Sequence, residues 1–174
     1  LELKRIQTEV GLTFVFVTHD QEEAMTMADT VAVMNGGVIE QMGSPVELYE
    51  RPRTTFVANF LGQSNLLRGT VIGSDATSIG VDVEGARLIA HRDESLAVGA
   101  DSGEVWVGVR PEKSYLAAAG AELGDDSNSL RGGVVIDVSF IGVSTQYVVR
   151  MTWGQSLTVF EQNTAARERF RLDD

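Results

Sequence analysis

The stretch TFVFVTHDQEEAMTMA, residues 13–28, decides the fold of the first part of the chain. Residues 13–17 are β-branched or aromatic, a composition typical of a strand that is buried on both faces in a parallel sheet. From Gln21 onward the stretch is rich in Glu, Ala and Met, which favour a helix, and Asp20 and Glu23 have the spacing of a capping box. The pattern therefore predicts strand, turn and helix, with His19 at the carboxyl end of the strand, where open α/β sheets bind ligands.

The composition limits the classes of protein that the chain can represent. Its 174 residues allow one or two domains, and a hydrophobic content of 43% is enough for a folded core. The net charge of -11 argues against nucleic-acid binding, which needs basic patches. Cysteine, a signal peptide and a bilayer-spanning apolar run do not occur, so we expect a protein compatible with the cytoplasm. The acidic loop around Glu122, Asp125 and Asp126 lacks the ligand spacing of a calcium loop, and we expect no metal site.

Two groups of apolar residues are expected in the core of the first part. Residues 1–11 have apolar side chains at helical spacing, which predicts a helix with one buried stripe. This stripe consists of Leu3, Ile6 and Val10. Methionines also lie in or near the following elements, and methionines usually fill gaps in a core. They are Met25, Met27, Met34 and Met42.

Turn and cap residues predict a hairpin over residues 31–42 and two short helices after it. These residues are Asn35 and Gly36 in the hairpin turn, Ser44, Pro45 and Glu47 at the first helix start, Pro52 after its end, and Gly62 after the second helix.

The composition changes after Gly62, where Val, Gly, Ser and Thr become more frequent. Residues 63–65 are expected to form a linker. Beyond them, short apolar segments between turn residues predict strands, and this spacing favours a small barrel or sandwich. The strands are expected at residues 66–72, 78–83, 86–91, 104–109, 131–138, 144–151 and 155–160, with a loop at 117–129 and a corner at 140–142.

The sequence around His19 resembles a known family. VTHDQEEAMTMAD, followed by VAVMNGGVIEQMGSPVELYERPRTTFVANFLG, is similar to the last part of ABC-transporter ATPase subunits, over residues 1–67. The resemblance is to the importer class that carries an additional C-terminal regulatory domain. The second half resembles that domain, the transport-associated OB domain, in three short motifs: Val109-Arg110-Pro111-Glu112, residues 140–142 and residues 147–149.

This resemblance implies an α+β chain. A truncated α/β remnant of the ATPase domain would cover residues 1–63, and an all-β OB-like regulatory barrel, without its last strand, would cover residues 64–174. His19 would be the switch histidine, a catalytic and ATP-binding residue that contacts the γ-phosphate, and a strand must then lead into it.

The resemblance implies ATP and Mg²⁺ as cofactors of a longer parent protein that energises solute uptake. The P-loop, the signature and the magnesium-binding segment that hold them do not occur in this sequence, whose lysines are Lys4 and Lys113. The chain is therefore expected to be a piece of that ATPase, without bound cofactor and without ATP hydrolysis of its own.

The resemblance also implies partners and a location. These are a second copy of the ATPase subunit, an integral-membrane permease and, indirectly, an extracytoplasmic solute-binding protein, at the cytoplasmic face of the cell membrane and without nucleic acid. The segment FVANFLGQSNLL is more similar to polyamine (spermidine/putrescine-like), iron and opine-like importers than to sugar importers. Thr30 replaces an arginine of the family, so an ion pair from that position is lost. Both ends look trimmed, and we expect the apolar residues 13–17 to be left uncovered and to be buried by another copy.

Two other functions are open from the residues alone. The chain could be a stand-alone OB-like protein that binds or senses a small ligand. It could also be a hydrolase that uses His19 with Asp20 or Glu23, although no serine or cysteine nucleophile is placed beside them. Arg110 and Glu112 could form a solvated ion pair at a strand end or take part in signalling.

Overall fold

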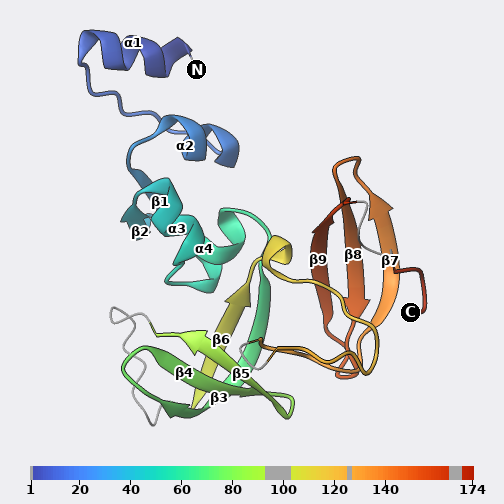
Figure 1. Ribbon diagram of the computed structural model, residues 1–174. Helices are drawn as coiled ribbons and strands as arrows, with labels where there is room; N and C mark the ends of the chain where they lie inside the picture. The colour runs from blue at the N-terminus through green and yellow to red at the C-terminus, as the bar shows by residue number, and fades with distance from the viewer. Residues whose placement is uncertain (1, 93–102, 125–126, 165–169) are drawn as a thin grey trace. The chain divides into compact units, whose positions relative to one another are not determined.

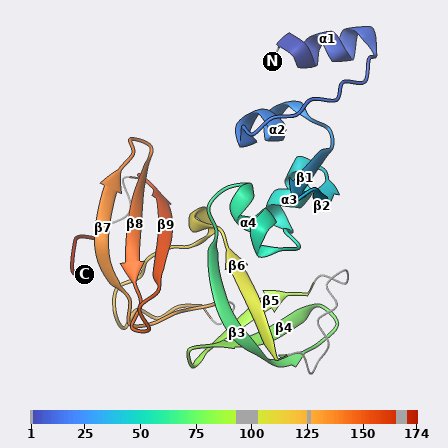
Figure 2. The same ribbon diagram turned by 180° about the vertical axis from the view of Figure 1, so that it is seen from behind.

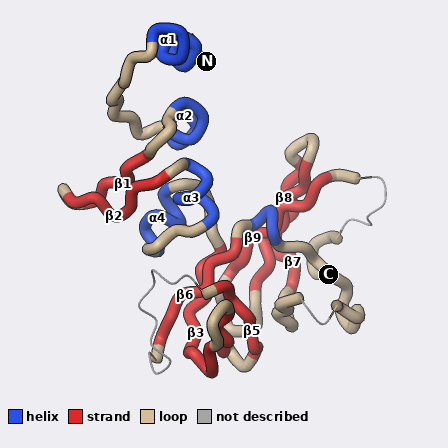
Figure 3. The backbone as a smooth tube through the Cα atoms, turned by 60° about the vertical axis from the view of Figure 1, so that its left-hand side comes forward, coloured by secondary structure: helices blue, strands red, loops and turns tan. Residues whose placement is uncertain are grey.

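The computed structural model describes residues 2–92, 103–124, 127–164 and 170–174 (Figure 1). The chain divides into two compact units, residues Leu1–Gln63 and Ser64–Asp174. Helices account for 19% and strands for 39% of the described residues, which confirms the predicted α+β class. Helices and larger sheets are segregated along the chain, with most described helices in the first unit and most described strands in the second (Figure 3).

The first unit contains four short helices and one hairpin. They are α1 (Glu2–Val10), α2 (Gln21–Met27), β1 (Val31–Asn35), β2 (Val38–Gly43), α3 (Pro45–Glu50) and α4 (Thr55–Phe60).

Side chains cap the starts of α2, α3 and α4, as the sequence predicts at Asp20 and Ser44 but not at Thr54. Asp20, Ser44 and Thr54 each accept a hydrogen bond from the backbone N–H three residues further on, at 3.1, 3.2 and 3.2 Å. Each bond satisfies a backbone donor that has no partner within the helix. The predicted second, third and fourth helices are therefore confirmed, and α3 ends before Pro52 as expected.

The hairpin is also confirmed, with a shift in its turn. Asn35 pairs with Val38, so the two-residue loop consists of Gly36 and Gly37 and not of Asn35-Gly36. Both glycines have positive φ, 56° and 85°, as a type I′ turn requires. Gly37 thus adopts the second left-handed conformation of the turn, which Asn35 would have had to adopt if the loop were Asn35-Gly36.

The core of the first unit is small. It consists of Val33, Leu48, Val57 and Leu61, with Met25, Val31, Phe56 and Phe60 packed against it. Met25 therefore lies at the core as predicted, but Met34 and Met42 are exposed, so the expectation that all the methionines fill a core is wrong. Their side chains lie on the face of the hairpin opposite Val33, because side chains alternate along a strand.

The strand predicted over residues 13–17 is not present. Residues 12–18 have no regular secondary structure, and the side chains of Val15 and Val17 are 92% and 99% exposed. A strand of a parallel sheet needs neighbouring strands, and the described part of the chain provides none beside this segment. The buried stripe expected on the first helix is also wrong at Ile6 and Val10, whose side chains are exposed on α1; the Leu3 side chain lies outside what the structure describes. The uncovered apolar surface expected at residues 13–17 is present.

The second unit is built from strands. They are β3 (Asn65–Ser74), β4 (Ser78–Val83), β5 (Ala86–His91), β6 (Glu104–Val109), β7 (Val134–Phe140), β8 (Ser144–Arg150) and β9 (Ser156–Gln162), with a 3-10 turn η1 (Pro111–Lys113) after β6. They form two antiparallel sheets, in the orders β5-β4-β3-β6 and β7-β8-β9. Figure 2 shows the three strands of the smaller sheet side by side.

The two sheets share one hydrophobic core, which joins them without a continuous ladder among the described strands. Its buried members are Leu67, Ile79, Val81, Val83, Leu88, Val135, Tyr147, Val149, Met151, Leu157 and Val159. β4 approaches its neighbour β3 closely at Gly69, where an added Cβ would lie 2.5 Å from the Asp82 carbonyl oxygen. The small barrel or sandwich that the sequence predicts is thus observed as two sheets that share one core.

Side chains at the start of β3 connect the two sheets. The Asn65 amide donates to the Thr158 carbonyl at 2.7 Å and accepts from the Thr158 N–H at 2.8 Å. The Gln155 amide donates to the Leu66 carbonyl at 2.7 Å. Asn65 is buried, so the expectation that residues 63–65 form a linker is wrong at this position.

The last described residues return to the smaller sheet. The Val135 N–H donates to the Asp174 carbonyl, and the Asp173 N–H donates to the Val135 carbonyl. Phe170 packs edge-on against Tyr147, with ring centroids 6.4 Å apart. Phe170 of this segment packs against the core beside β7. The strand β7 itself begins three residues later than the sequence predicts.

Candidate functional site

His19 lies in a short bend directly before α2, and its side chain is exposed. The residues on either side of it are held by a local network. The Asp20 N–H donates to the Thr18 hydroxyl at 2.9 Å, and that hydroxyl donates to the Glu23 carboxylate at 2.9 Å. The Asp20 carboxylate in turn accepts from the Glu23 N–H. The expected capping box is therefore present in a relayed form, with the Thr18 hydroxyl between the Asp20 N–H and the Glu23 side chain.

This network fixes the backbone at His19 while leaving its imidazole free to meet a ligand. No hydrogen-bond partner of the His19 side chain occurs among the residues that the structure describes. An exposed imidazole can donate a hydrogen bond to a phosphate oxygen or accept a proton. The site thus offers one exposed imidazole, on a backbone that is held by the hydrogen bonds of Thr18, Asp20 and Glu23.

The hydrolase alternative does not gain support from this geometry. A general base needs a neighbouring group to orient it and a nucleophile within hydrogen-bond reach. The Asp20 carboxylate serves as a helix cap and the Glu23 carboxylate accepts from Thr18, so both candidate carboxylates have structural roles.

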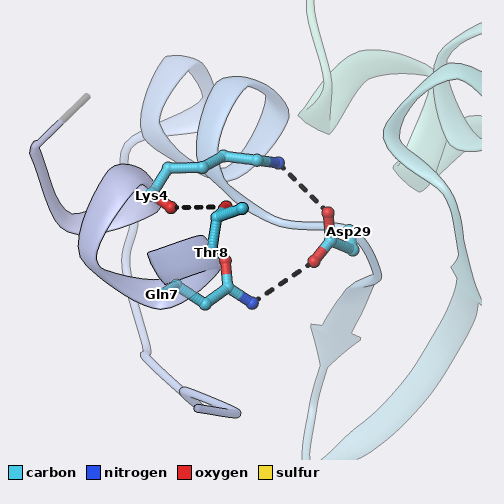
Figure 4. A network of polar contacts seen from close by, with 4 residues as sticks. All are labelled: Lys4, Gln7, Thr8 and Asp29. Atoms are coloured by element: carbon cyan, nitrogen blue, oxygen red, sulfur yellow. Dashed lines mark hydrogen bonds and ion pairs between the residues drawn. The ribbon is translucent and has the colours of Figure 1, made fainter. Parts of the chain in front are cut away.

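The residues after α2 are tied to α1 by a second network, shown in Figure 4. The Asp29 carboxylate accepts hydrogen bonds from the Lys4 ammonium at 3.1 Å and from the Gln7 amide at 3.4 Å. The Lys4 side chain, through its hydrogen bond and its charge, and the Gln7 amide hold the pKa of Asp29 below its usual value. Asp29, the neighbour of Thr30, therefore pairs with α1.

Arg110 is buried, which contradicts the interpretation as a solvated group at a strand end. Its guanidinium donates to the Ser64 hydroxyl at 2.8 Å, so it fixes the first residue of the second unit. Buried arginines are rare unless their donors are satisfied. The VRPE word thus has a structural role here, and a signalling role for Arg110 or Glu112 stays a prediction.

Several polar residues that position the second unit were not singled out from the sequence. Asn65, Asn128 and Gln155 each bond backbone groups far along the chain. A buried asparagine at a strand start has no local signature, because its partner is a carbonyl and an N–H many residues away. Sequence patterns of caps and turns miss such bonds, since those patterns span only a few residues.

The described residues offer little to hold a cofactor. Within residues 2–92, 103–124, 127–164 and 170–174, no three His, Asp or Glu side chains are grouped as a metal ion would need. Asp125 and Asp126 of the acidic loop lie outside the described residues. No helix in the described part of the chain is long and apolar enough to cross a membrane. His19 remains the candidate ligand-binding residue.

Comparison with known protein families gives a match to the later part of the second unit. Residues 107–174 match the family described as the TOBE domain. This match begins within β6 and includes η1, all of β7-β8-β9 and the last described residues. Residues 107–174 are therefore similar to a TOBE domain, a resemblance that the VRPE motif and the corner at residues 140–142 predict.

Comparison with curated proteins extends the resemblance to both units. The chain is 45% identical over 166 residues to the spermidine/putrescine import ATP-binding protein PotA of Thermobifida fusca (strain YX), covering 95% of this chain and 41% of that protein. It is 44% identical to the protein of the same name from Frankia alni, over 94% of this chain and 36% of the relative. The relative from Ruegeria pomeroyi is 38% identical, over 97% of this chain and 43% of its own length.

These matches confirm the resemblance that the sequence around His19 predicts. The chain is similar, over nearly its whole length, to a part of importer ATP-binding proteins. It spans between 36% and 43% of the length of these relatives.

Proposed function

We propose that this chain is the C-terminal part of the ATP-binding subunit of an ABC importer, with a polyamine such as spermidine or putrescine as the transported solute. In the longer parent protein, ATP hydrolysis would energise uptake, and the TOBE-containing unit, residues 64–174, would serve dimerisation and regulation. The observation that carries this proposal is the match to import ATP-binding proteins over both units. A stand-alone OB-like sensor would not require similarity across residues 1–63.

The proposal gives His19 the role of the residue that contacts the terminal phosphate of ATP. Its support is the position of His19 at a bend held by Thr18, Asp20 and Glu23, with the imidazole exposed. The strand that this role requires before His19 does not form among the described residues, so the proposal requires that other segments of the parent supply the strands that would pair with residues 13–17. The described residues do not by themselves fit ATP and Mg²⁺, because one imidazole is not a phosphate cradle and no acidic cluster accompanies it. The groups that would hold the nucleotide and the metal ion are proposed to belong to other segments of the parent.

The parent would work at the cytoplasmic face of the cell membrane. Its proposed partners are a second copy of the same subunit, an integral-membrane permease and, indirectly, an extracytoplasmic solute-binding protein. The import function in the relatives' names supports this set of partners.

The His19 assignment is tested in the full-length parent, expressed from the complete reading frame. We expect His19→Ala to reduce ATP turnover on the order of 10²–10³-fold, the loss typical of removing one donor that stabilises developing charge. His91→Ala is the matched control, because His91 is the second of the 2 histidines and lies in β5 of the other unit. Equal turnover in both variants would remove His19 from the site.

The parentage itself is tested by the reading frame upstream of Leu1. The proposal requires an in-frame P-loop there, and an unrelated upstream sequence would favour the stand-alone sensor. Polyamine as the solute is tested separately, by comparing spermidine, putrescine and ferric-iron uptake in cells that carry or lack the parent gene.

A further inference from the structure

A small hydrogen-bonded turn encloses His19, the residue that carries the proposed phosphate contact. The Asp20 N–H donates to the Thr18 hydroxyl at 2.9 Å, so this bond connects the residue before His19 with the residue after it. A threonine hydroxyl that accepts from the N–H two residues further on forms an ST turn. The backbone torsion angles of His19 lie inside this turn, which restricts them. Residues 18–23, with the bonds that join them, are called the His19 turn below.

The Thr18 hydroxyl is itself oriented from the first turn of α2. It donates to the Glu23 carboxylate at 2.9 Å. A threonine hydroxyl has one proton and two lone pairs. Because the proton is directed at Glu23, a lone pair is left for the Asp20 N–H. The Glu23 carboxylate therefore sets the orientation in which Thr18 accepts the bond that closes around His19.

The His19 turn contains more than a helix cap requires. In a direct capping box, the Glu23 carboxylate would accept from the Asp20 N–H, and both bonds would lie between residues 20 and 23. His19 would then stand outside the bonded segment. Here the Asp20 carboxylate still accepts from the Glu23 N–H at 3.1 Å, but the return bond runs through Thr18. The additional member, Thr18, thus acts on the backbone of His19 as well as on the helix start.

The His19 turn is also local. Its three bonds join groups of residues 18–23 only, so it does not depend on strands that would pair with residues 13–17 in the parent. Thr18 is half-buried and His19 is exposed. The turn therefore restrains the backbone while the imidazole stays accessible to a ligand.

We propose that Thr18 and Glu23 are positioning residues for His19, which hold its backbone so that the imidazole meets the terminal phosphate in one orientation. A donor stabilises developing charge best when it is already in place, because no reorganisation is then needed during the reaction. Neither Thr18 nor Glu23 contacts the nucleotide in this arrangement. The inference deepens the proposed function and rests on it, since it takes His19 as the phosphate contact.

The His19 turn is tested first in the chain itself, by NMR measurement of amide exchange at Asp20. Thr18→Val keeps the shape of the side chain and removes the hydroxyl, so the Asp20 amide should exchange about fivefold faster, the change expected for one lost hydrogen bond. Thr18→Ser keeps a hydroxyl and should keep the slower exchange. Thr26→Val is the matched control, because the Thr26 hydroxyl donates to the Glu22 carbonyl within α2, at 2.6 Å. Unchanged exchange in Thr18→Val would overturn the proposal.

The positioning role is tested by ATP turnover of the full-length parent. A misplaced group can cost about 10²-fold in rate, so Thr18→Val should lower kcat about 10- to 100-fold, with a smaller change in the KM for ATP. Thr18→Ser should retain most of the turnover. Glu23→Ala should lower kcat less than Thr18→Val, because the Thr18 hydroxyl can still accept from the Asp20 N–H. Glu22→Ala, in the same turn of α2, is the control and should leave kcat unchanged.

A double-mutant cycle separates positioning of His19 from a general structural role of Thr18. In a His19→Ala background, Thr18→Val should cause no further loss of kcat, because the imidazole through which Thr18 acts is absent. Additive losses would overturn the positioning role and leave the His19 assignment intact. If His19→Ala alone leaves turnover unchanged, the proposed phosphate contact fails and the positioning role fails with it, so the two failures give different results.

Discussion

The two units of the chain are stabilised over different ranges of sequence. In residues 1–63, the helix caps and the hairpin turn bind groups within a few residues, and the core has four buried members. In residues 64–174, eleven buried side chains from two sheets form one core, and Asn65 and Thr158 bond across a sequence separation of 93. The comparison shows that good local signals shape elements without burying them. The helix α1 illustrates this, because it forms while its apolar residues Ile6 and Val10 remain exposed.

The largest effect is expected from the core of the second unit. Tyr147 is among its most buried side chains and also contacts Phe170, so Tyr147→Ala should lower the free energy of unfolding by about 3–5 kcal/mol. Both tryptophans lie in the second unit, so fluorescence during urea unfolding reports on it. Phe140→Ala, at an exposed position, is the control and should change stability by less than about 0.5 kcal/mol. Similar losses of stability in Tyr147→Ala and Phe140→Ala would contradict the shared core.

The next largest effect concerns the bond between the two sheets. Asn65→Ala removes both hydrogen bonds to Thr158 and leaves a buried N–H and a buried carbonyl unsatisfied, so we expect a loss of about 2–3 kcal/mol. Ser139→Ala, in the same unit, removes only an exposed hydrogen bond to Asp137 and should have little effect. Fluorescence-detected urea unfolding again gives the comparison, which fails if the two variants prove equally destabilised.

A smaller effect should be confined to the first unit. Ser44→Ala removes the cap of α3 and should cost about 1 kcal/mol there. If the units are stabilised separately, the helical circular-dichroism transition should shift while the tryptophan transition stays in place. A shift of both transitions together would show that the two units unfold as one.

The smallest effect depends on pH. The Asp75 carboxylate accepts from the Ser78 hydroxyl and from the Thr77 and Ser78 N–H groups, which lowers its pKa from 3.8 to about 2. Since the folded pKa is lowered, this stabilisation is present above pH 3.8 and disappears as the pH falls toward 2. Asp75→Asn should remove that part of the acid dependence, and an NMR titration that gives Asp75 an ordinary pKa would contradict it.

The success of sequence-based prediction followed the same division. The caps at Asp20 and Ser44, the hairpin and the strand β6 were predictable because their signals lie within a few residues of the structure they set. The strand at residues 13–17 was wrong because its composition describes a sheet whose other strands do not occur in the described residues. Asn65 was placed in a linker because nothing in its neighbours reveals Thr158.

The candidate site shows the same limit. The position of His19 before a capped helix was predictable, and the structure places it there with an exposed side chain. The Thr18 relay was not predicted, because a hydroxyl that both accepts and donates can replace the direct contact of a capping box. Burial of Arg110 was also missed, since burial depends on strands far from it in sequence.

The contact between the final residues and β7 has a consequence for measurements of motion. The Val135 amide donates to the Asp174 carbonyl, and Phe170 of the same segment lies against Tyr147. Deuterium uptake at the Val135 amide would therefore report the detachment of residues 170–174 from the sheet, before the strands themselves separate. One backbone N–H thus provides a local probe of how firmly the far end of the chain is anchored.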